Sequence, residues 1–486
     1  MTKLSDRALN DGVLRPDYDR GALRSRIVHL GFGAFHRAHQ AVLTDAVARH
    51  FGGDWGICEV SLMTEQPILD LRAQGHQFAV IERGPEVPCT RIVGAVTEAL
   101  HPKLDGIASI VAKMAEPQVA IVSLTITEKG YCIDPGSGRL DLDNPMVQRD
   151  LDAPDRPASA IGVIVQALRL RRTNGVGGLS VMSCDNIQGN GQVTRNAVTD
   201  FARLRDPDLA DWIKAHVSFP STMVDRIVPA VTPETAREIA EILGSPDPCG
   251  VVCEPFIQWV IEDDFVAGRP DWQAVGAQFV SDVTPFEEMK LRMLNGSHSF
   301  LAYLGYLSGY ETIFDSVSDP DFRRAAFDMM MLGQAPSLDL PAGTSAETYA
   351  QQLIQRFANP GLKHKTWQIA MDGSQKIPQR FGGGLLHHLR QGTEFRWHAA
   401  GIAAWMRYVA GTDEAGRPID VRDPMAAQLR AICDRHGPNT SVVQELLRLE
   451  AVFPGQIGQS ERVLDAVAQA YQSLIDNGAK ATVAAL

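Results

Sequence analysis

A lysine, an amide and an imidazole stand close together between Lys290 and His298, in a largely apolar run. On an α-helix, Asn295 would lie roughly 140° and His298 roughly 80° around the axis from Lys290, so the three side chains could face one side. A lysine on an apolar face is costly to charge, which makes Lys290 a candidate general base with a lowered pKa. The same residues also allow a simpler interpretation: an exposed lysine, a turn at Asn295-Gly296 and a histidine in the core.

Polar residues follow two apolar runs that are typical of buried strands. Residues 119–124 end at Thr125, and residues 179–183 end shortly before Asn186. In an open α/β sheet, ligands bind outside the carboxyl ends of the strands. We therefore expect Thr125 and Asn186 to lie where a cofactor and a substrate meet, although Asn186 by itself also suits an Asx turn or a helix cap.

A glycine turn follows the first predicted strand, residues 27–30, and a helical pattern covers residues 34–50. Such a turn brings backbone N–H groups and a helix N-terminus up to a pyrophosphate. The third glycine of the dinucleotide fingerprint is absent, with His36 in its place, so a plain tight turn is the alternative. The residues expected to contact a dinucleotide are Gly31, Phe32, Gly33, Ala34 and Phe35.

An acidic residue near the end of the second strand would hold the adenosine ribose. Glu59 is the nearest candidate in the predicted strand 55–62, and Glu65 is a poorer one. No arginine follows that strand directly, which favours NAD over NADP. His36 and His39 are three residues apart, whereas zinc-binding helices space their histidines by four, and no third ligand lies nearby. We therefore expect no metal site.

The composition is that of an ordinary globular enzyme, with 21% charged and 45% apolar residues among 486. A net charge of -12 without a basic block argues against nucleic acid or an anionic membrane as the main partner. The first 26 residues contain no apolar targeting core, and no run of about 18 apolar residues follows. Seven cysteines without a C-x-x-C pair suggest reduced thiols. We expect a cytoplasmic protein that is a monomer or a weak homo-oligomer.

The order of the predicted elements indicates two domains. Apolar runs alternate with helical patterns up to residue 284, which predicts an α/β fold with a Rossmann-like dinucleotide-binding domain over residues 1–284. Further strands are expected at 78–81 and 91–93, and a helix at 158–172. Residues 285–486 should form a mostly α-helical domain that carries Lys290, with the glycine run at 382–384 in a loop. Its helices are expected at 287–307, 321–331, 346–357, 395–409, 424–435 and 463–477.

The chain resembles the polyol-specific long-chain dehydrogenases, the mannitol dehydrogenase family. The pattern Lys-x-x-x-x-Asn-x-x-His, here Lys290, Asn295 and His298, is the signature of that family. Supporting stretches lie at 27–39, 123–131, 182–186, 223–229 and 372–380. Within the family, the runs at 55–63, 253–272, 290–313 and 366–380 are most similar to the fructuronate reductase branch.

The resemblance implies roles for residues that spacing alone does not assign. Lys290 would be the general base in oxidation and the acid in reduction, and His298 would orient the substrate and the lysine. Asn186 and Asn295 would donate hydrogen bonds to the developing alkoxide. Glu287 would belong to a proton path to solvent, and Asp225 and Lys376 would position substrate hydroxyls.

The implied reaction is the metal-free, NAD(H)-dependent interconversion of D-mannonate and D-fructuronate, with mannitol 2-dehydrogenation or the oxidation of another polyol or aldonate as the alternative. A sugar acid needs a cation away from the reacting carbon, for which we consider Arg380, Lys376 and Arg37. Relatives active on mannitol carry an arginine where Gln368 stands, which puts a polyol substrate in doubt. A nucleotide sensor without turnover is a further hypothesis, and the intact lysine, asparagines and histidine argue against it.

Overall fold

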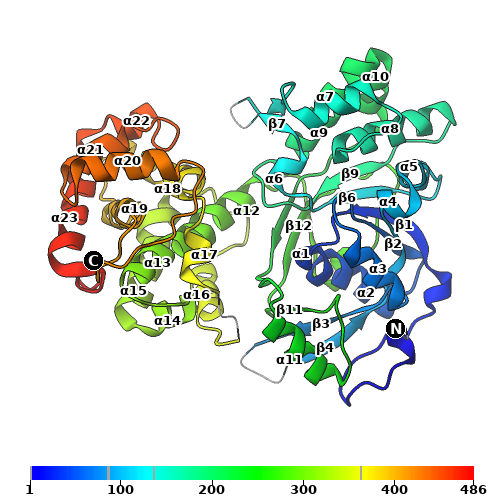
Figure 1. Ribbon diagram of the computed structural model, residues 1–486, viewed down its shortest axis with the longest axis horizontal. Coiled ribbons are helices and arrows are strands. Elements are labelled where there is room, and N and C mark those ends of the chain that lie inside the picture. The colour runs from blue at the N-terminus through cyan, green and yellow to red at the C-terminus, as the bar shows by residue number, and fades with distance from the viewer. Residues whose placement is uncertain (1–2, 85–87, 135–136, 362–363) are drawn as a thin grey trace. The chain divides into compact units, whose positions relative to one another are not determined.

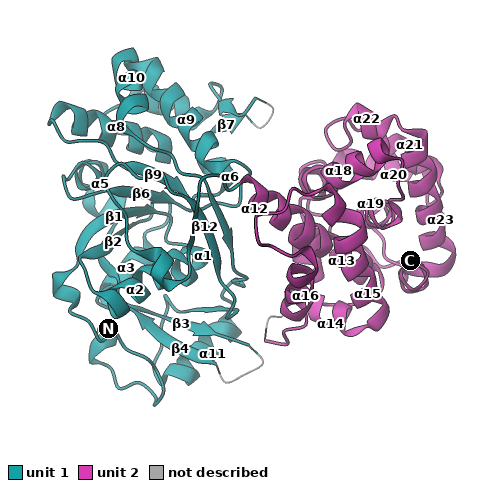
Figure 2. Cartoon of the chain, turned by 180° about the vertical axis from the view of Figure 1, so that it is seen from behind, with its two compact units in different colours: residues 1–283 teal, residues 284–486 magenta. Residues whose placement is uncertain are grey.

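The computed structural model describes residues 3–84, 88–134, 137–361 and 364–486. The chain divides into two compact units, Met1–Val283 and Thr284–Leu486 (Figure 2). The division falls one residue before the boundary expected from the sequence. Each unit has its own hydrophobic core.

The first unit is built on a five-stranded sheet in which every neighbouring pair is parallel (Figure 1). Its spatial order is β5-β2-β1-β6-β9, which is 3-2-1-4-5 in order along the chain. The order therefore reverses between β1 and β6, and this is the switch point where α/β sheets bind their ligands. The strands are β1 (Arg24–Leu30), β2 (Trp55–Val60), β5 (Val96–Leu100), β6 (Ile121–Leu124) and β9 (Ser180–Ser183). The sequence predicted all of them except β5.

Helices cover both faces of this sheet because alternate strand residues point to opposite sides. Ile27 and Ile121 pack toward α2 (Gln40–Phe51) and α3 (Gln66–Ala73), whereas Val28 and Val122 pack toward α5 (Ile107–Met114) and α8 (Ala160–Thr173). Figure 1 shows these two helical layers above and below the strands. The strands are buried on both faces, which is why they appear in the sequence as short continuous apolar runs.

Two three-stranded sheets and the β7-β8 hairpin complete the strands described in the first unit. One has the order β11-β3-β4, and the other β10-β12-β13. The predicted strands at 78–81 and 91–93 are β3 (Phe78–Glu82) and β4 (Cys89–Val93), but they pair with each other antiparallel and lie outside the main sheet. Only six residues separate them, and a parallel pair needs a crossover of a dozen or more. The other strands are β10 (Thr222–Asp225), β11 (Val251–Cys253), β12 (Gln258–Glu262) and β13 (Gln278–Val280).

The remaining elements of the first unit are mostly helices and turns. The helix expected at 34–50 is broken at His39 into α1 (Ala34–Ala38) and α2, since His39 adopts φ -124° and ψ -94°. The others are α4 (Pro102–Asp105), α6 (Thr127–Gly130), β7 (Ile133–Asp134), β8 (Arg139–Leu140), α7 (Pro145–Asp152), α9 (Asn190–Arg205), α10 (Pro207–His216), α11 (Pro233–Leu243) and the 3-10 turns η1 (Leu4–Asp6), η2 (Arg20–Ala22) and η3 (Trp272–Val275).

The second unit is helical, as the sequence predicts. Its central helix is α13 (Gly296–Leu307), which is buried along nearly its whole length. The helices around it are α12 (Thr284–Met289), η4 (Lys290–Asn295), α14 (Ile313–Ser318), α15 (Pro320–Asp328), η5 (Met329–Gln334), η6 (Ala335–Ser337), α16 (Ala346–Phe357), α17 (Thr366–Ala370), α18 (Gly373–Gln391), α19 (Arg396–Val409), α20 (Ala426–His436), α21 (Ser441–Leu447), α22 (Gly455–Gly458) and α23 (Glu461–Ala484). Among the described residues, no helix is both long and apolar enough to span a membrane.

The glycine run at 382–384 was expected in a loop, and this prediction is wrong. The three glycines lie inside α18. A Cβ at Gly384 would stand 2.5 Å from both Gln334 Oε1 and His398 Nε2, and one at Gly383 would stand 2.8 Å from Arg292 Nε. The glycines are therefore explained by close packing of α18 against its neighbours, which sequence patterns do not reveal.

Candidate active site

A cavity of about 460 Å³ opens at the switch point of the main sheet, a size typical of small-molecule sites. It lies at the carboxyl ends of β1, β2 and β6. Four of the residues predicted to bind a cofactor line it: Gly31, Phe32, Gly33 and Thr125. The loop after β2 contributes residues that the sequence analysis did not single out, namely Ser61, Leu62, Met63 and Thr64.

Gly31 shows why the turn after β1 needs a glycine. Its φ is +113°, and a Cβ would stand only 2.1 Å from the backbone oxygen of Thr125. The Gly31 N–H donates to the Val60 carbonyl at 2.8 Å, and the Thr125 N–H donates to the Leu30 carbonyl at 2.9 Å. The ends of β1, β2 and β6 are thus joined at the cavity, with no room for a side chain at Gly31. At Gly33 the space is open, since a Cβ would meet only the Gly31 oxygen at 3.9 Å.

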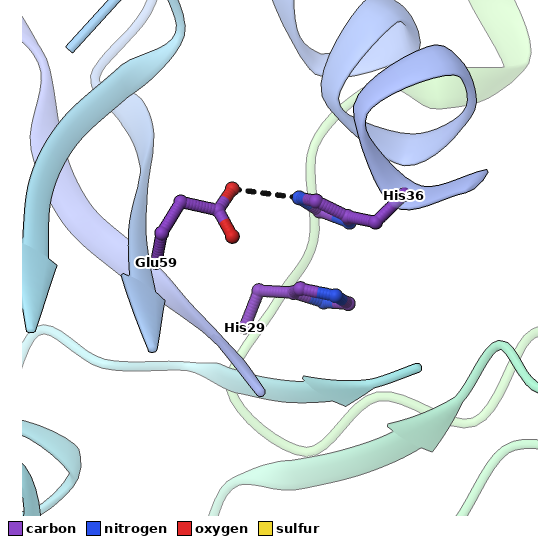
Figure 3. A group of neighbouring side chains, drawn as sticks. All are labelled: His29, His36 and Glu59. Carbon is purple, nitrogen blue, oxygen red and sulfur yellow. Dashed lines mark hydrogen bonds and ion pairs between the residues drawn. The ribbon is translucent and has the colours of Figure 1, made fainter. Parts of the chain in front are cut away.

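Glu59 does not lie where the ribose prediction requires. Its side chain is fully buried, and its Oε1 lies 2.7 Å from the Nε2 of the equally buried His36 (Figure 3). Burial raises the pKa of Glu59 to about 7. The burial contradicts the prediction that Glu59 binds the adenosine ribose. Glu65, the poorer candidate, is half-buried and lies 3.8 Å from Lys103 Nζ.

The loop after β9 is tied to the loop after β6 through Asp185. The Asp185 carboxylate accepts hydrogen bonds from the backbone N–H groups of Ile126 and Thr127 at 2.9 and 3.0 Å, and from the Tyr131 hydroxyl at 2.7 Å. Burial raises the pKa of Asp185, and these donors oppose the rise. The neighbouring Asn186 is exposed. Asp185 therefore ties the loop that carries Asn186 to the loop after β6, at the same edge of the sheet as the cavity.

Asp225 and Arg37 occupy well-held positions in the first unit. Asp225 is the last residue of β10 and is buried, and Arg226 beside it donates to the Ala38 and Glu254 carbonyls. The Arg37 guanidinium donates to the backbone oxygens of Cys249 and Gly33. These bonds favour a structural role for Arg37, tying the turn to the strand that follows Cys249, over the predicted contact with a substrate carboxylate.

In the second unit, Lys290 and Asn295 are the two ends of η4, a π-helix. A π-helix bonds residue i to residue i+5, so residues five apart lie one above the other, and such turns are frequent at functional sites. The Gly296 N–H donates to the Leu291 carbonyl in this pattern. The α-helical geometry assumed from the sequence is therefore wrong here. Both are buried, each 8% exposed, and Glu287 lies one element earlier in α12.

His298 stands in the first turns of α13 and is buried. Its ring centroid lies 4.4 Å from that of Phe357 and 5.6 Å from that of His364. Burial, and then the neighbouring His364, Arg380 and Arg356, lower the pKa of His298 well below its usual range. His298 is therefore neutral at physiological pH, and its ring has one N–H donor and one acceptor nitrogen.

Arg380 and Lys376, both on α18, lie beside this group. Arg380 donates from its NH1 nitrogen to the Asn295 carbonyl at 3.2 Å and to the Ser299 hydroxyl oxygen at 2.8 Å. Burial lowers the pKa of Arg380 to about 10, so it stays charged at neutral pH. Lys376 donates to the Ile369 and Met371 carbonyls at 3.2 and 2.6 Å.

His364 is a residue of this group that the sequence analysis missed. Burial and then the charge of Lys376 lower its pKa to about 4. It lies in a loop before α17, outside any periodic pattern, so no signal in the sequence could have singled it out. The second unit thus gathers Lys290, Asn295 and His298, which are buried, with the half-buried Arg380 and His364 into a polar cluster beside the π-helix.

The fold and these residues define a class of protein: a Rossmann-type dinucleotide-binding unit joined to a helical unit with a buried lysine and amide. The family model of the mannitol dehydrogenase Rossmann domain matches residues 25–274, and that of the mannitol dehydrogenase C-terminal domain matches residues 282–475. The chain belongs to the mannitol dehydrogenase family, which confirms the resemblance inferred from the Lys290 pattern and the predicted fold class.

Individual relatives are similar over their full lengths. The chain is 55% identical to the D-mannonate oxidoreductase of Escherichia coli, over 100% of both chains. It is 54% identical to the uncharacterized oxidoreductase YeiQ of the same organism, over 99% of this chain and 98% of that one. The mannitol 2-dehydrogenase of Pseudomonas fluorescens, solved as a ternary complex with NAD and D-mannitol, has a TM-score of 0.87 at 40% identity and covers 98% of this chain and 96% of that chain.

Proposed function

We propose that this protein is an NAD-dependent oxidoreductase that interconverts D-mannonate and D-fructuronate. The observation that carries the substrate assignment is the 55% identity to the D-mannonate oxidoreductase over the whole of both chains. The buried Lys290 and Asn295, held one π-turn apart, support the reaction type. A sensor without turnover would not need a buried lysine beside an amide, because burying that charge is costly.

The first unit fits a dinucleotide. The cavity follows the first strand of a 3-2-1-4-5 sheet, and Gly33 leaves open space where a pyrophosphate would approach the backbone. We propose that Gly31, Phe32, Gly33 and Thr125 hold the cofactor, with Ala34 and Phe35 at the start of α1. When bound, NAD⁺ supplies the hydride acceptor at C4 of its nicotinamide.

We propose that Lys290 accepts the proton of the substrate hydroxyl. As the substrate carbinol loses its hydride and becomes a carbonyl, its hydroxyl proton passes to the Lys290 Nζ, and the Asn295 amide donates to the oxygen as negative charge develops. We propose Asn186 as a second amide donor. His298 and His364 have pKa values far below neutrality, so they are weak bases and serve to orient rather than to accept the proton.

Recognition of the sugar acid requires a cation. Arg380 remains charged and bonds the backbone of Asn295, which places its guanidinium beside the reacting group. Lys376 is the second cation of the cluster, and its charge acts on His364. We propose that these two bind the carboxylate, with Asp225 positioning substrate hydroxyls and Glu287 serving the proton path. The protein would work in the cytoplasm, where its seven free cysteines stay reduced, as a monomer or a weak homo-oligomer.

The test combines a substrate panel with a variant. Purified protein is assayed by NADH absorbance with mannonate, altronate, mannitol, arabinitol and sorbitol, each with NAD⁺ and NADP⁺. We expect the highest kcat/KM for mannonate with NAD⁺. A higher value for mannitol would replace the proposed substrate while keeping the reaction type.

The variant Lys290→Met tests the base. We expect turnover to fall by roughly 10²- to 10⁴-fold, the range that general acid–base catalysis contributes, with NADH binding unchanged. The matched control is Lys103→Met, since the Lys103 side chain is 71% exposed and belongs to the other unit. Retention of near-native turnover by Lys290→Met at pH 7 would remove the proposed role.

A further inference from the structure

A stacked pair of histidines lies buried beneath the glycine turn. His29, next to last in β1, and His36 in α1 have ring centroids 3.4 Å apart and ring planes inclined by 12°. Glu59 reaches the edge of the His36 ring from β2 (Figure 3). All three side chains are inaccessible to solvent, and the mechanism above uses none of them.

A metal ion is one conceivable use of this group, since its ligand atoms lie within 4.8 Å of one another. The stacking argues against it. The lone pair of an imidazole nitrogen lies in the plane of its ring, and two nearly parallel rings direct their lone pairs along separate planes rather than toward one point. One His36 nitrogen also faces Glu59 directly at 2.7 Å, which leaves no space for an ion between them.

The hydrogen bonds of His29 point instead to the turn. Its Nε2 lies 3.0 Å from the Gly31 carbonyl and 2.9 Å from the Thr125 hydroxyl, and that hydroxyl donates to the same carbonyl at 2.8 Å. A carbonyl oxygen can only accept, so the contact with Gly31 assigns the ring proton to Nε2. With that assignment the Ser123 hydroxyl donates to Nδ1 rather than to Gln40 Oε1, which lies 2.9 Å from it. The Nδ1 of the ring faces the Ser123 hydroxyl at 2.8 Å. The ring thus spans β1 and β6 just below the cavity.

The contact at the Gly31 carbonyl fixes the shape of the turn. The Gly33 N–H also donates to this oxygen, at 2.7 Å. This one oxygen therefore fixes the orientation of the backbone at Gly31 and Gly33 and of the Thr125 side chain. These are the residues that line the cavity. Movement of this carbonyl would turn the Gly33 backbone away from a bound pyrophosphate.

We propose that His29 is a positioning residue for dinucleotide binding, whose Nε2–H holds the Gly31 carbonyl, and that the His36–Glu59 pair keeps its ring in place. The proposal rests on the proposed use of NAD. His29 does not touch the cofactor; it acts through Gly31 and Thr125. Because the ring is buried among fixed partners, the turn is ordered before the cofactor arrives, which lowers the entropic cost of binding.

Two substitutions of His29 test the contacts of its two ring nitrogens separately. A glutamine amide nitrogen is as many bonds from the backbone as Nε2, so His29→Gln keeps a donor for Gly31. The asparagine amide oxygen is as many bonds from the backbone as Nδ1 and accepts as Nδ1 does, so His29→Asn keeps the contact with Ser123 and loses the one with Gly31. NADH dissociation constants are measured by fluorescence, together with KM for NAD⁺ and kcat. We expect His29→Asn to bind NADH about tenfold more weakly, and His29→Gln within about threefold of the wild type, with kcat at saturating NAD⁺ little changed in both.

The matched control is His388→Phe in the second unit. His388 is also buried between a glycine carbonyl, Gly333 at 2.7 Å, and a threonine hydroxyl, Thr393 at 2.7 Å. Its loss should lower the melting temperature without changing NADH affinity. If both His29 variants fail to fold, Ser123→Ala removes the hydroxyl that holds Nδ1 of the ring, from a residue outside the cavity, and should also weaken NADH binding severalfold.

The outcomes are distinct. Equal NADH affinity in His29→Asn, His29→Gln and the wild type overturns the positioning role. A wild-type protein that does not bind NADH overturns the proposed function itself. Stoichiometric metal in the purified protein that is lost in His36→Phe, measured by elemental analysis, overturns the argument from stacking and assigns the group to a metal.

Discussion

The two glycines of the turn after β1 should respond differently to the same small change. At Gly31, alanine would meet the Thr125 oxygen at 2.1 Å with φ at +113°. At Gly33, with φ -83°, the new methyl group would have only the Gly31 oxygen nearby, at 3.9 Å. Gly31→Ala is thus expected to disturb the fold, and Gly33→Ala to disturb only the approach of a ligand.

The magnitude for Gly31→Ala follows from two costs. A side chain in a left-handed conformation costs about 1 to 2 kcal/mol. Forcing extra volume into a packed site costs about 1 to 3 kcal/mol more. The free energy of unfolding should therefore fall by roughly 2 to 5 kcal/mol, which for a unit of this size lowers Tm by roughly 5 to 15 °C.

The assay is thermal unfolding by circular dichroism, with NADH titration by fluorescence on the same samples. Gly33→Ala should melt within about 2 °C of the wild type, yet bind NADH at least about tenfold more weakly, because the second glycine of such turns lets the pyrophosphate approach the backbone. A Gly31→Ala protein that melts like the wild type would refute the steric reasoning. Unchanged NADH affinity in Gly33→Ala would refute the placement of the pyrophosphate.

Two further predictions concern buried groups elsewhere. Burial lowers the pKa of His39 to about 3, against about 6.5 when unfolded, so its contribution to stability is present above pH 6.5 and lost as pH falls toward 3. Between pH 7 and pH 5, the free energy of unfolding measured by chemical denaturation should fall by about 2 kcal/mol less in His39→Leu than in the wild type. An identical pH dependence in the two proteins would show that His39 does not remain neutral. In α18, Gly384→Ala should lower the free energy of unfolding by a few kcal/mol because its methyl group would overlap Gln334 and His398. Gly382→Ala, with its nearest atom at 3.9 Å, should raise it by about 0.5 to 1 kcal/mol, and a reversed order would contradict the packing.

The elements that the sequence predicted best are those whose residues carry a strong local pattern. The strands β6 and β9 are buried along their whole length, and α16 was placed at its observed bounds, Ala346–Phe357. Strand β5 was missed because its polar residues, such as Glu98, interrupt the apolar run. Strands β3 and β4 were predicted as strands, but the sheet they belong to was not, since pairing depends on contacts between segments far apart in the chain.

For the candidate site, the sequence by itself determined the chemical groups: a lysine, two asparagines, a histidine and a glycine turn at a strand end. Only the tertiary structure decided which of them are available. Glu59 is buried against His36 and is not accessible to a ribose. Arg37 donates to backbone carbonyls instead of being free to bind a substrate. The reason is physical. The type of a residue determines its possible chemistry, whereas its accessibility and its partners depend on segments that are distant in the chain and cannot be inferred from the local sequence.

The π-helical turn from Lys290 to Asn295 also separates what the sequence predicts from what the structure decides. The pattern from Lys290 to Asn295 predicted a helix, and the residues were right, but one extra residue in the turn changed which side chains stand above one another. That register follows from backbone bonds from residue i to residue i+5, such as Gly296 N–H to the Leu291 carbonyl, which residue spacing alone does not show. The sequence therefore specified the reacting groups, and the folded structure decided their geometry.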